Sequence, residues 1–325
     1  MDREGLLSGV GGFAGVRAGN GWTRNLLEAG RLRAGEKLLV VVDDPLAAEG
    51  EELAEAGRAA GAEVRVARWN AAAPPLQDGR WADLVLFLAQ VPKGPEATAR
   101  FELGGAANEG GGREIFLGLV TPELLRGELS RPQPDLTATA RGLLARLEGA
   151  RELHVGGRAG TDLTLRVDGR PWLTDALELG PGDFANFPGG EVFVAPLSDG
   201  ADGVLVADLT VPYTVEGLVD EPVTLRFERG RVVSIEGGRA AAMLRDLVES
   251  AGEGADVIAE LGIGFNPTVS PRGHVMLDEK AADTAHVAIG RNTGSYGGDN
   301  EASIHVDCVF SAPTITVDGA PLDLP

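Results

Sequence analysis

The spacing of apolar residues changes near residue 150, and this change constrains the fold of the chain. Before it, short apolar runs such as residues 38–42 alternate with longer segments of helical period such as residues 47–60. Strands separated by helices require crossover connections, which produce a parallel sheet covered by helices. After it, the period is that of strands. We therefore predict two domains, at residues 1–150 and 151–325.

The first domain is predicted to be α/β, with an open and mostly parallel sheet. Its predicted strands are residues 38–42, 63–67, 83–88 and 114–119, and its helices end near residues 29, 60 and 147. The glycines Gly104-Gly105 and Gly110-Gly111-Gly112 do not open a helix directly after a strand with the spacing of a phosphate-binding loop. We predict turns at both places.

The second domain is predicted to be α+β, rich in antiparallel sheet. Residues 161–167 alternate polar and apolar side chains, as expected of a strand with one buried face. The sequence Glu228-Arg229-Gly230-Arg231 predicts a hairpin turn, and residues 239–250 a helix. The remaining predicted strands are residues 152–155, 203–209, 223–228 and 232–236, with others around the last two histidines.

Composition limits the partners and the location of the protein. A formal charge of −20 would repel nucleic acid and anionic membranes, so neither is an expected partner. No apolar run is long enough to cross a bilayer, and the segment MDREGLLSGVGGF lacks the pattern of a signal peptide. We expect a cytoplasmic protein. Its single cysteine, Cys308, excludes an internal disulfide and is predicted to pack in the core.

Three of the four histidines fall between residues 274 and 305, and this cluster is where we expect chemistry. Residues i and i+2 of a strand share a face, so His305 and Asp307 would present an imidazole and a carboxylate side by side. His286 lies shortly before them. A lone histidine more often has a structural role, but this mixture of groups suits a borderline metal ion.

Two glutamates stand in unusually apolar surroundings. Glu191 follows a Pro-Gly-Gly turn and enters an apolar strand, and Glu260 lies among apolar residues and glycines. A carboxylate on its own is ordinarily exposed, and burying one without a partner is very costly. A shared metal ion would serve both.

These residues lie in motifs that resemble the M29 metallo-aminopeptidases, the aminopeptidase T or thermophilic metalloprotease-like family. The likeness is weak in the first half, where it rests on the Gly35-Glu36-Lys37 turn and its neighbours, and it is specific in the second half. The matching segments, in the family's order, are residues 160–164, 186–196, 260–266, 286–290 and 300–307.

The resemblance implies two divalent metal ions, such as Zn, Co, Mn or Mg. They would be bound by the residues at the family's ligand positions, Glu191, Glu260, His286, His305 and Asp307. It also implies an aminopeptidase that removes the N-terminal residue of short peptides with a metal-held water, and a homodimer with its active site between domains. These are expectations from the family.

The resemblance assigns proton transfer to Glu279, although a small insertion separates it from His286 relative to longer members. Lys280 replaces an asparagine of the family and is expected to pair with a nearby carboxylate. The longer members carry a tyrosine that is held to stabilise the oxyanion, and Thr293 stands at that position here. Tyr296, in a glycine-rich loop, is the candidate substitute, although the same loop would suit a plain surface.

Two other functions stay open. The wider M29-like group includes a ring-cleaving dihydroxypyridine dioxygenase with a single Fe(II), which His286, His305 and Asp307 would hold here. Alternatively, the chain is a catalytically inactive metal-binding homologue, which the absence of the family tyrosine would allow. His274 and His154 have no counterparts among the family's ligands, and we expect structural roles or, for His274, contact with substrate.

Overall fold

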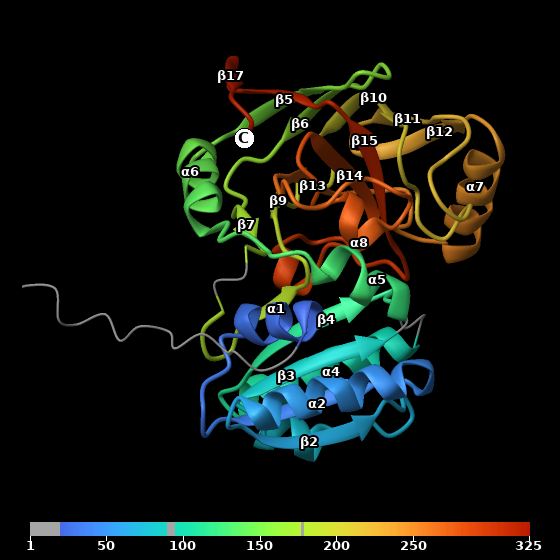
Figure 1. The fold of residues 1–325 in the computed structure, drawn as a ribbon. Coiled ribbons are helices and arrows are strands. Elements are labelled where there is room, and N and C mark those ends of the chain that lie inside the picture. Colours follow the sequence, from blue (N-terminus) through green and yellow to red (C-terminus); the bar gives the residue numbers. More distant parts are fainter. Residues whose placement is uncertain (1–19, 90–94, 177–178) are drawn as a thin grey trace, which may run out of the picture.

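The computed structural model describes residues 20–89, 95–176 and 179–325, which form two stacked domains (Figure 1). The first holds a parallel sheet with helices on both faces. The second holds two antiparallel sheets packed against each other. The predicted fold class, α/β followed by α+β with antiparallel sheet, is confirmed.

The first sheet has five parallel strands in the order β2-β1-β3-β4-β8. Its strands are β1 (Lys37–Val42), β2 (Glu63–Arg68), β3 (Leu84–Ala89), β4 (Arg113–Gly118) and β8 (Phe184–Asn186). The accompanying helices are α1 (Gly21–Ala29), α2 (Ala47–Ala59), α3 (Leu76–Trp81), α4 (Pro95–Glu109) and α5 (Pro122–Arg126), with 3₁₀ turns η1 (Asp44–Leu46) and η2 (Glu128–Ser130).

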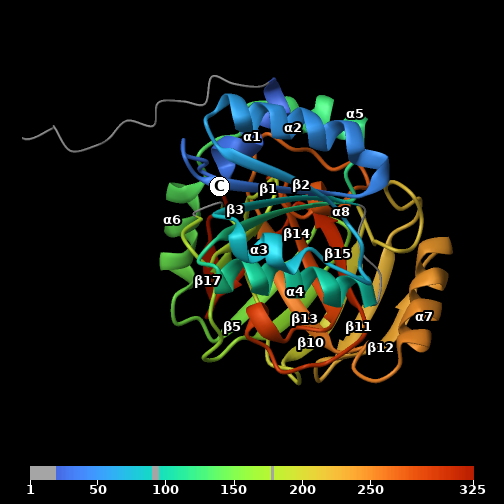
Figure 2. The same cartoon turned by 90° about the horizontal axis from the view of Figure 1, so that it is seen from below.

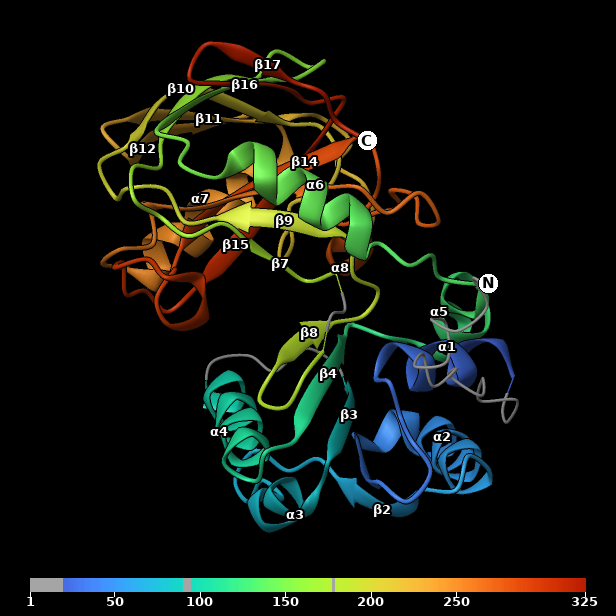
Figure 3. The same ribbon diagram turned by 90° about the vertical axis from the view of Figure 1, so that its left-hand side faces the viewer.

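Helices cover both faces of the first sheet, which explains why β1 is apolar almost throughout. Leu38 and Val40 pack with the residues of α1 and α2. Leu39 and Val41 pack on the other side, with Leu103 of α4. Figure 2 and Figure 3 show α1 and α2 on one face and α3 and α4 on the other. A strand buried on both faces has no polar side to expose.

The prediction of a turn at Gly104-Gly105 was wrong, because both glycines lie within α4. Helix α4 packs so closely on the sheet that a Cβ at Gly104 would lie 2.5 Å from Oε2 of Glu114 on β4. Glycine is tolerated inside the helix because it permits this approach. The predicted turn at Gly110-Gly111-Gly112 follows the end of α4 and precedes β4, as expected.

The second domain packs two antiparallel sheets around one core. The large sheet has the order β12-β11-β10-β6-β5-β16-β17, and the site sheet has the order β15-β14-β13-β9-β7. The large sheet contains β5 (Glu152–Gly156), β6 (Asp162–Arg166), β10 (Ala201–Ala207), β11 (Val223–Glu228), β12 (Arg231–Glu236), β16 (Thr314–Val317) and β17 (Ala320–Leu322). The site sheet contains β7 (Leu173–Thr174), β9 (Glu191–Val194), β13 (Ile258–Gly264), β14 (Thr284–Gly290) and β15 (His305–Ser311).

Three helices and one 3₁₀ turn complete the second domain. They are α6 (Thr137–Leu147), α7 (Arg239–Ala251), α8 (Val275–Asp278) and η3 (Gly294–Tyr296). Helix α6 belongs to this domain although it precedes residue 150, because Ala140, Leu143 and Leu147 pack in the core of the domain. The predicted hairpin turn is present between β11 and β12, where Arg229 and Gly230 both have positive φ, as a primed turn requires. Cys308 is fully buried in the core, as predicted.

The chain crosses the predicted boundary at residue 150 once more. After β5, β6 and β7 have formed in the second domain, residues 184–186 return to the first sheet as β8, parallel to β4. Glu191 begins β9 of the site sheet shortly afterwards. In the described part of the chain, no helix combines the length and apolarity needed to cross a bilayer.

Candidate metal centre

Four neighbouring strands of the site sheet bring the five predicted ligands together. Glu191 begins β9, Glu260 lies within β13, His286 lies within β14, and His305 and Asp307 lie on one face of β15. In the sheet these strands are adjacent, in the order β15-β14-β13-β9. The antiparallel pairing therefore joins segments that are more than a hundred residues apart in the sequence.

The side chains converge to within a few ångströms. Nε2 of His286 lies 3.5 Å from Oε1 of Glu260, 3.6 Å from Oε2 of Glu191 and 3.8 Å from Oδ1 of Asp307. Nε2 of His305 lies 3.3 Å from Oε2 of Glu260 and 3.1 Å from Oδ1 of Asp307. The two oxygens of Glu260 thus face different histidines.

Two sets of three potential ligands share Glu260. One is Glu191, Glu260 and His286, and the other is Glu260, His305 and Asp307. We call them the Glu191 position and the Asp307 position. Within each set the ligand atoms lie within 4.8 Å of one another. Mixed nitrogen and oxygen donors at this spacing suit a divalent transition metal.

The donor set fits a cation for a further reason. Oε2 of Glu191 is buried and has no hydrogen-bond partner among the described residues. A buried carboxylate oxygen without a partner is costly, and a bound cation would remove this cost. The assignment of the five residues as ligands nevertheless stays a prediction.

Gly262 makes room for the His286 imidazole. It lies on β13 directly opposite His286 on β14, and a Cβ there would lie 2.0 Å from Cε1 of the ring. No side chain larger than glycine can occupy this position without moving the imidazole. Sequence reasoning did not single out Gly262, because the requirement depends on the strand register.

Asp175 and Lys280 hold Glu191 in place. Oδ1 of Asp175 accepts hydrogen bonds from the backbone N–H groups of Gly190 and Glu191, both at 2.9 Å. The Lys280 ammonium donates to Oε1 of Glu191 and lies 3.0 Å from Oδ2 of Asp175 and 2.9 Å from Oε1 of Glu279. Lys280 was expected to pair with one carboxylate, and it contacts three.

Glu279 is buried beside the candidate ligands rather than exposed on a turn. One of its oxygens belongs to a third potential set with His286 and Asp307. The preceding residue, Asp278, accepts hydrogen bonds from the backbone N–H groups of residues 272, 273 and 274 at 2.9, 2.7 and 3.1 Å. These bonds anchor α8, so that Glu279 and Lys280 enter the site from a fixed backbone.

The histidines gain protons when no cation is bound. Burial alone would lower the pKa of His286, but the hydrogen bond that the imidazole donates to Glu260 and the charges of Glu191 and Asp307 raise this pKa to about 9. Burial also lowers the pKa of His305. Interactions with Tyr296 and Asp307 outweigh this effect, so the pKa of His305 lies well above its ordinary value. Both imidazoles would have to release protons before binding a metal.

The carboxylates divide into two groups. Burial raises the pKa of Glu191 and of Glu279, and Lys280 offsets only part of this effect. Burial also raises the pKa of Asp307 and of Glu260. His286 and His305 outweigh this effect and hold both pKa values below the ordinary range. For Lys280, the three surrounding carboxylates outweigh burial and raise the pKa, so the side chain is an ammonium group.

Tyr296 lies against the candidate ligand His305. Their ring centroids are 5.0 Å apart, and the ring of Phe193 packs on the tyrosine from 5.8 Å. Thr293, which stands at the family's tyrosine position, is bound instead by Nε of Arg291 through its hydroxyl, at 3.1 Å. The structure therefore places the Tyr296 side chain, and not Thr293, beside the candidate ligands.

The two remaining histidines lie apart from these ligand sets. His274 directly precedes α8, where Asp278 accepts a hydrogen bond from its backbone N–H. Its Nε2 contacts the carbonyl oxygen of Leu119 in the first domain at 2.8 Å. His154 is on the surface, 2.7 Å from Asp162.

A residue that sequence reasoning missed is Tyr213. The residue is 48% exposed, and partial desolvation, followed by the charge of Asp307, raises the pKa of its hydroxyl. The chain has two tyrosines, and both interact electrostatically with Asp307. This was not visible in the sequence, because Tyr213 follows β10, a strand of the other sheet.

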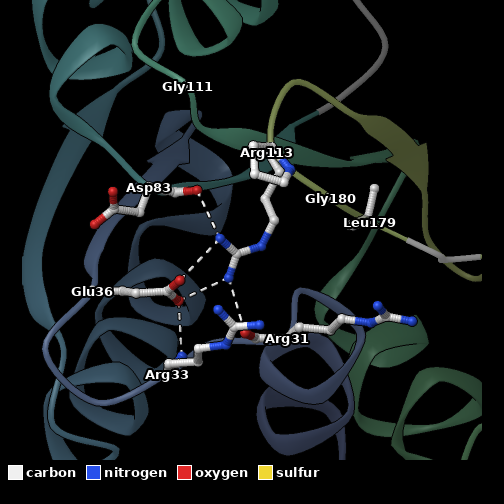
Figure 4. A pocket seen from close by; sticks show the side chains of 9 residues that line it. Arg31, Arg33, Glu36, Asp83, Gly111, Arg113, Leu179 and Gly180 are labelled. Carbon is white, nitrogen blue, oxygen red and sulfur yellow. Dashed lines mark hydrogen bonds and ion pairs between the residues drawn. The ribbon is translucent and has the colours of Figure 1, made fainter.

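A separate cavity of about 320 Å³ lies near the amino ends of the strands of the first sheet (Figure 4). Arg113 crosses it and donates hydrogen bonds to Glu36 and to the carbonyl oxygens of Gly30, Arg31 and Asp83. Ligands of open parallel sheets bind at the carboxyl ends of strands. We assign this cavity a structural role.

Comparison with known proteins gives the family. A family model described as "NicX: 2,5-dihydroxypyridine 5,6-dioxygenase" matches residues 109–322, which is more than half of the chain. The chain belongs to this family. The matched residues include all five predicted ligands of the metal centre and both predicted catalytic residues, Glu279 and Tyr296.

The relatives of this chain include both peptidases and a dioxygenase. It is 31% identical to aminopeptidase AmpS of Bacillus subtilis over 186 residues, which are 50% of this chain and 44% of the relative. It is 30% identical to 2,5-dihydroxypyridine 5,6-dioxygenase of Pseudomonas putida over 161 residues, 48% of this chain and 45% of the relative. It is 29% identical to aminopeptidase T of Thermus thermophilus over 309 residues, 87% of this chain and 72% of the relative.

Two of these three proteins also have similar solved structures. The Pseudomonas putida dioxygenase superposes with a TM-score of 0.75 at 22% identity, covering 94% of each chain. The Thermus thermophilus enzyme superposes with a TM-score of 0.66 at 21% identity, covering 93% of this chain and 98% of the other. At this identity the superpositions establish a shared fold.

The comparisons confirm the resemblance to the aminopeptidase T family, which the sequence motifs indicated. They support a peptidase, and they give the dioxygenase alternative comparable support. The matched segments span less than half the length of the first two relatives, so the activities of those proteins are not carried over directly.

Proposed function

We propose that this protein is a metal-dependent aminopeptidase that hydrolyses the N-terminal peptide bond of short peptides. The observation that supports this most strongly is the pair of ligand sets that share Glu260. Two metal ions joined by one carboxylate are typical of hydrolytic sites, including those of aminopeptidases. Relatives named as aminopeptidases, at about 30% identity, support the same reaction class.

When bound, the two ions would supply an activated water and hold the amino group and first carbonyl of the peptide. The chain's own groups account for the proton. Glu279 is buried with a raised pKa, and its carboxylate lies among the ligand atoms, so it can take a proton and release it to the leaving amine. The Tyr296 side chain lies beside His305, where its hydroxyl can serve as a donor to developing negative charge.

Burial of the site is the remaining contribution of the fold. Glu191, Glu260 and His286 are each at most 5% exposed, so charges there are screened weakly by water. The first domain contacts the loop after β14, where Arg291 stacks at 5.4 Å over Phe101 of α4. The resemblance to the family implies an active site in a cleft between the domains, and such a cleft would admit a short peptide and exclude a folded protein. We also expect the homodimer of the family, which light scattering would test.

A second function is favoured by one specific observation. The Lys280 ammonium already neutralises part of Glu191, and this would leave His286 and His305, whose Nε2 atoms lie 3.8 and 3.1 Å from Oδ1 of Asp307, to form a triad with Asp307 for a single Fe(II). The NicX family model and the dioxygenase relative favour the same alternative, a ring-cleaving dioxygenase. An inactive homologue is the third possibility.

Metal content and activity together test the proposal. The protein is purified anaerobically without added metal, and its metals are counted by mass spectrometry. It is then assayed on a panel of aminoacyl-p-nitroanilides with zinc, cobalt or manganese, and for oxygen uptake with 2,5-dihydroxypyridine. We expect p-nitroaniline release and zinc, cobalt or manganese in the protein. One iron per chain with oxygen uptake would establish the dioxygenase, and full metal occupancy without either activity would indicate an inactive homologue.

A further inference from the structure

The two ligand sets have different surroundings. At the Glu191 position, one oxygen of the ligand carboxylate is already bound by the Lys280 ammonium. Lys280 is 1% exposed and also contacts Asp175 and Glu279. A cation on the other oxygen of Glu191 would share that carboxylate with a buried positive charge. At the Asp307 position, Lys280 contacts none of the three potential ligands Glu260, His305 and Asp307 at ion-pair distance.

The hydrogen bonds of the two histidines also favour tighter metal binding at the Asp307 position. Nδ1 of His305 lies 2.7 Å from the carbonyl oxygen of Arg291, which can only accept, so Nδ1 keeps its proton and Nε2 is the nitrogen that would bind a metal after losing its own. Nδ1 of His286 is buried and has no partner among the described residues. A carbonyl partner fixes the tautomer and orientation of a ligand histidine and increases its basicity, and loss of such a partner typically weakens metal binding.

Starting from the proposed two-metal function, we infer that the two positions bind metal unequally. The Asp307 position holds its ion tightly, and the Glu191 position holds an exchangeable ion, because Lys280 competes there for the charge of Glu191. Lys280 is thus a positioning residue that sets the affinity of the second metal. At low free metal the protein carries one ion, and it gains the second only when metal is plentiful.

Zinc titration of the full-length metal-free protein tests this inference. The protein is equilibrated with zinc buffered by a chelator across a range of free concentrations, and bound zinc is counted by mass spectrometry. We expect one ion to bind at least tenfold more tightly than the second. Two ions of equal affinity, or no second ion at millimolar zinc, would overturn the inference.

A charge-neutral double variant tests the role of Lys280. Lys280→Met with Asp175→Asn removes one positive and one negative charge, and the asparagine carbonyl can still accept from the N–H groups of residues 190 and 191. We expect the second zinc to bind roughly tenfold or more tightly, because the ammonium that contacts the Glu191 carboxylate itself is gone, whereas Asp175 accepts only from the backbone there. The conservative Lys280→Arg variant retains the charge and should keep the second zinc weak. A second affinity unchanged in the double variant would refute the role of Lys280.

These outcomes are separable from the proposed reaction. Unequal zinc affinities that shift in the double variant, without p-nitroaniline release at full occupancy, would refute the aminopeptidase and leave the inference standing. Peptide hydrolysis by a protein that binds two ions with equal affinity would support the aminopeptidase and refute the inference of unequal metal binding.

Discussion

Replacing Gly262 by alanine is the most discriminating single change that the geometry offers. A Cβ at this position would lie 2.0 Å from Cε1, 2.3 Å from Nε2 and 2.8 Å from Nδ1 of the His286 ring. Non-bonded carbon atoms approach to about 3.5 Å, so the ring would have to move by more than roughly 1 Å. Both residues are in buried strands, and β13 cannot shift without breaking its pairing with β14 and β9.

The size of the effect follows from the distances in the site. Nε2 of His286 lies between 3.5 and 3.8 Å from three carboxylate oxygens, and metal ligand distances tolerate only about 0.2 Å. A displacement of about 1 Å removes the imidazole from the Glu191 position. We expect metal affinity there to fall by about 100-fold, or about 2.7 kcal/mol. Overpacking should also destabilise the metal-free protein by about 1–3 kcal/mol.

A double-mutant cycle isolates the cause. Zinc binding and urea unfolding are measured for Gly262→Ala, His286→Ala and the double variant. In the His286→Ala background the imidazole is gone, so the added methyl group should cost little, and the cycle should show strong coupling. Gly142→Ala is the control, because a Cβ there meets nothing within 4 Å. The reasoning fails if Gly262→Ala binds zinc normally, or if it is equally destabilising in both backgrounds.

Four further outcomes are expected. Asp307→Ala should abolish zinc binding at its position with an unchanged circular dichroism spectrum, whereas global unfolding would indicate a structural metal. Tyr296→Phe should lower kcat on aminoacyl-p-nitroanilides by about 100-fold at unchanged zinc content, as for loss of an oxyanion donor, and an unaffected kcat would exclude this role. In the metal-free protein the pKa of His286 is raised to about 9, so its contribution to stability is complete below about pH 6.5 and is lost as pH rises to about 9. The apparent affinity for zinc should rise over the same pH interval, because zinc displaces the proton. Calorimetry that shows no proton release on zinc binding would contradict this. Burial raises the pKa of Glu114 from 4.5 to about 7, which corresponds to about 3 kcal/mol, so Glu114→Gln should stabilise the protein by up to that amount at pH 8 and by little at pH 4, as chemical denaturation at the two pH values would reveal.

The fold was largely predictable, because its two halves differ in apolar period. Residues 38–42 and 47–60 match β1 and α2 within a residue. The predictions that failed concern features that depend on tertiary contacts. Gly104 and Gly105 have low helix propensity, and the close contact with Glu114 that favours them in α4 is not visible in the local sequence. The return of residues 184–186 to the first sheet likewise has no local signal in so short a strand.

The candidate site was predictable in its members and not in its electrostatics. His305 and Asp307 share a strand face, which follows from their spacing, and the family motifs supplied His286, Glu191 and Glu260. The contacts of Lys280 with three carboxylates depend on how α8 and β9 pack. The pairing of Gly262 with His286 depends on the register of β13 and β14. Such contacts arise between distant segments, and no local pattern encodes them.

The return of the chain to the first sheet links domain movement to metal binding. Asn186 pairs with Phe116 in the first domain, and Glu191 pairs with Gly264 in the second. Only residues 187–190 lie between these two anchors. Any rotation of one domain against the other must therefore be absorbed in a short tether that ends on a candidate ligand. A change in the angle between the domains would act on Glu191 through this tether, so the affinity of the candidate site for metal would depend on how the two domains are placed.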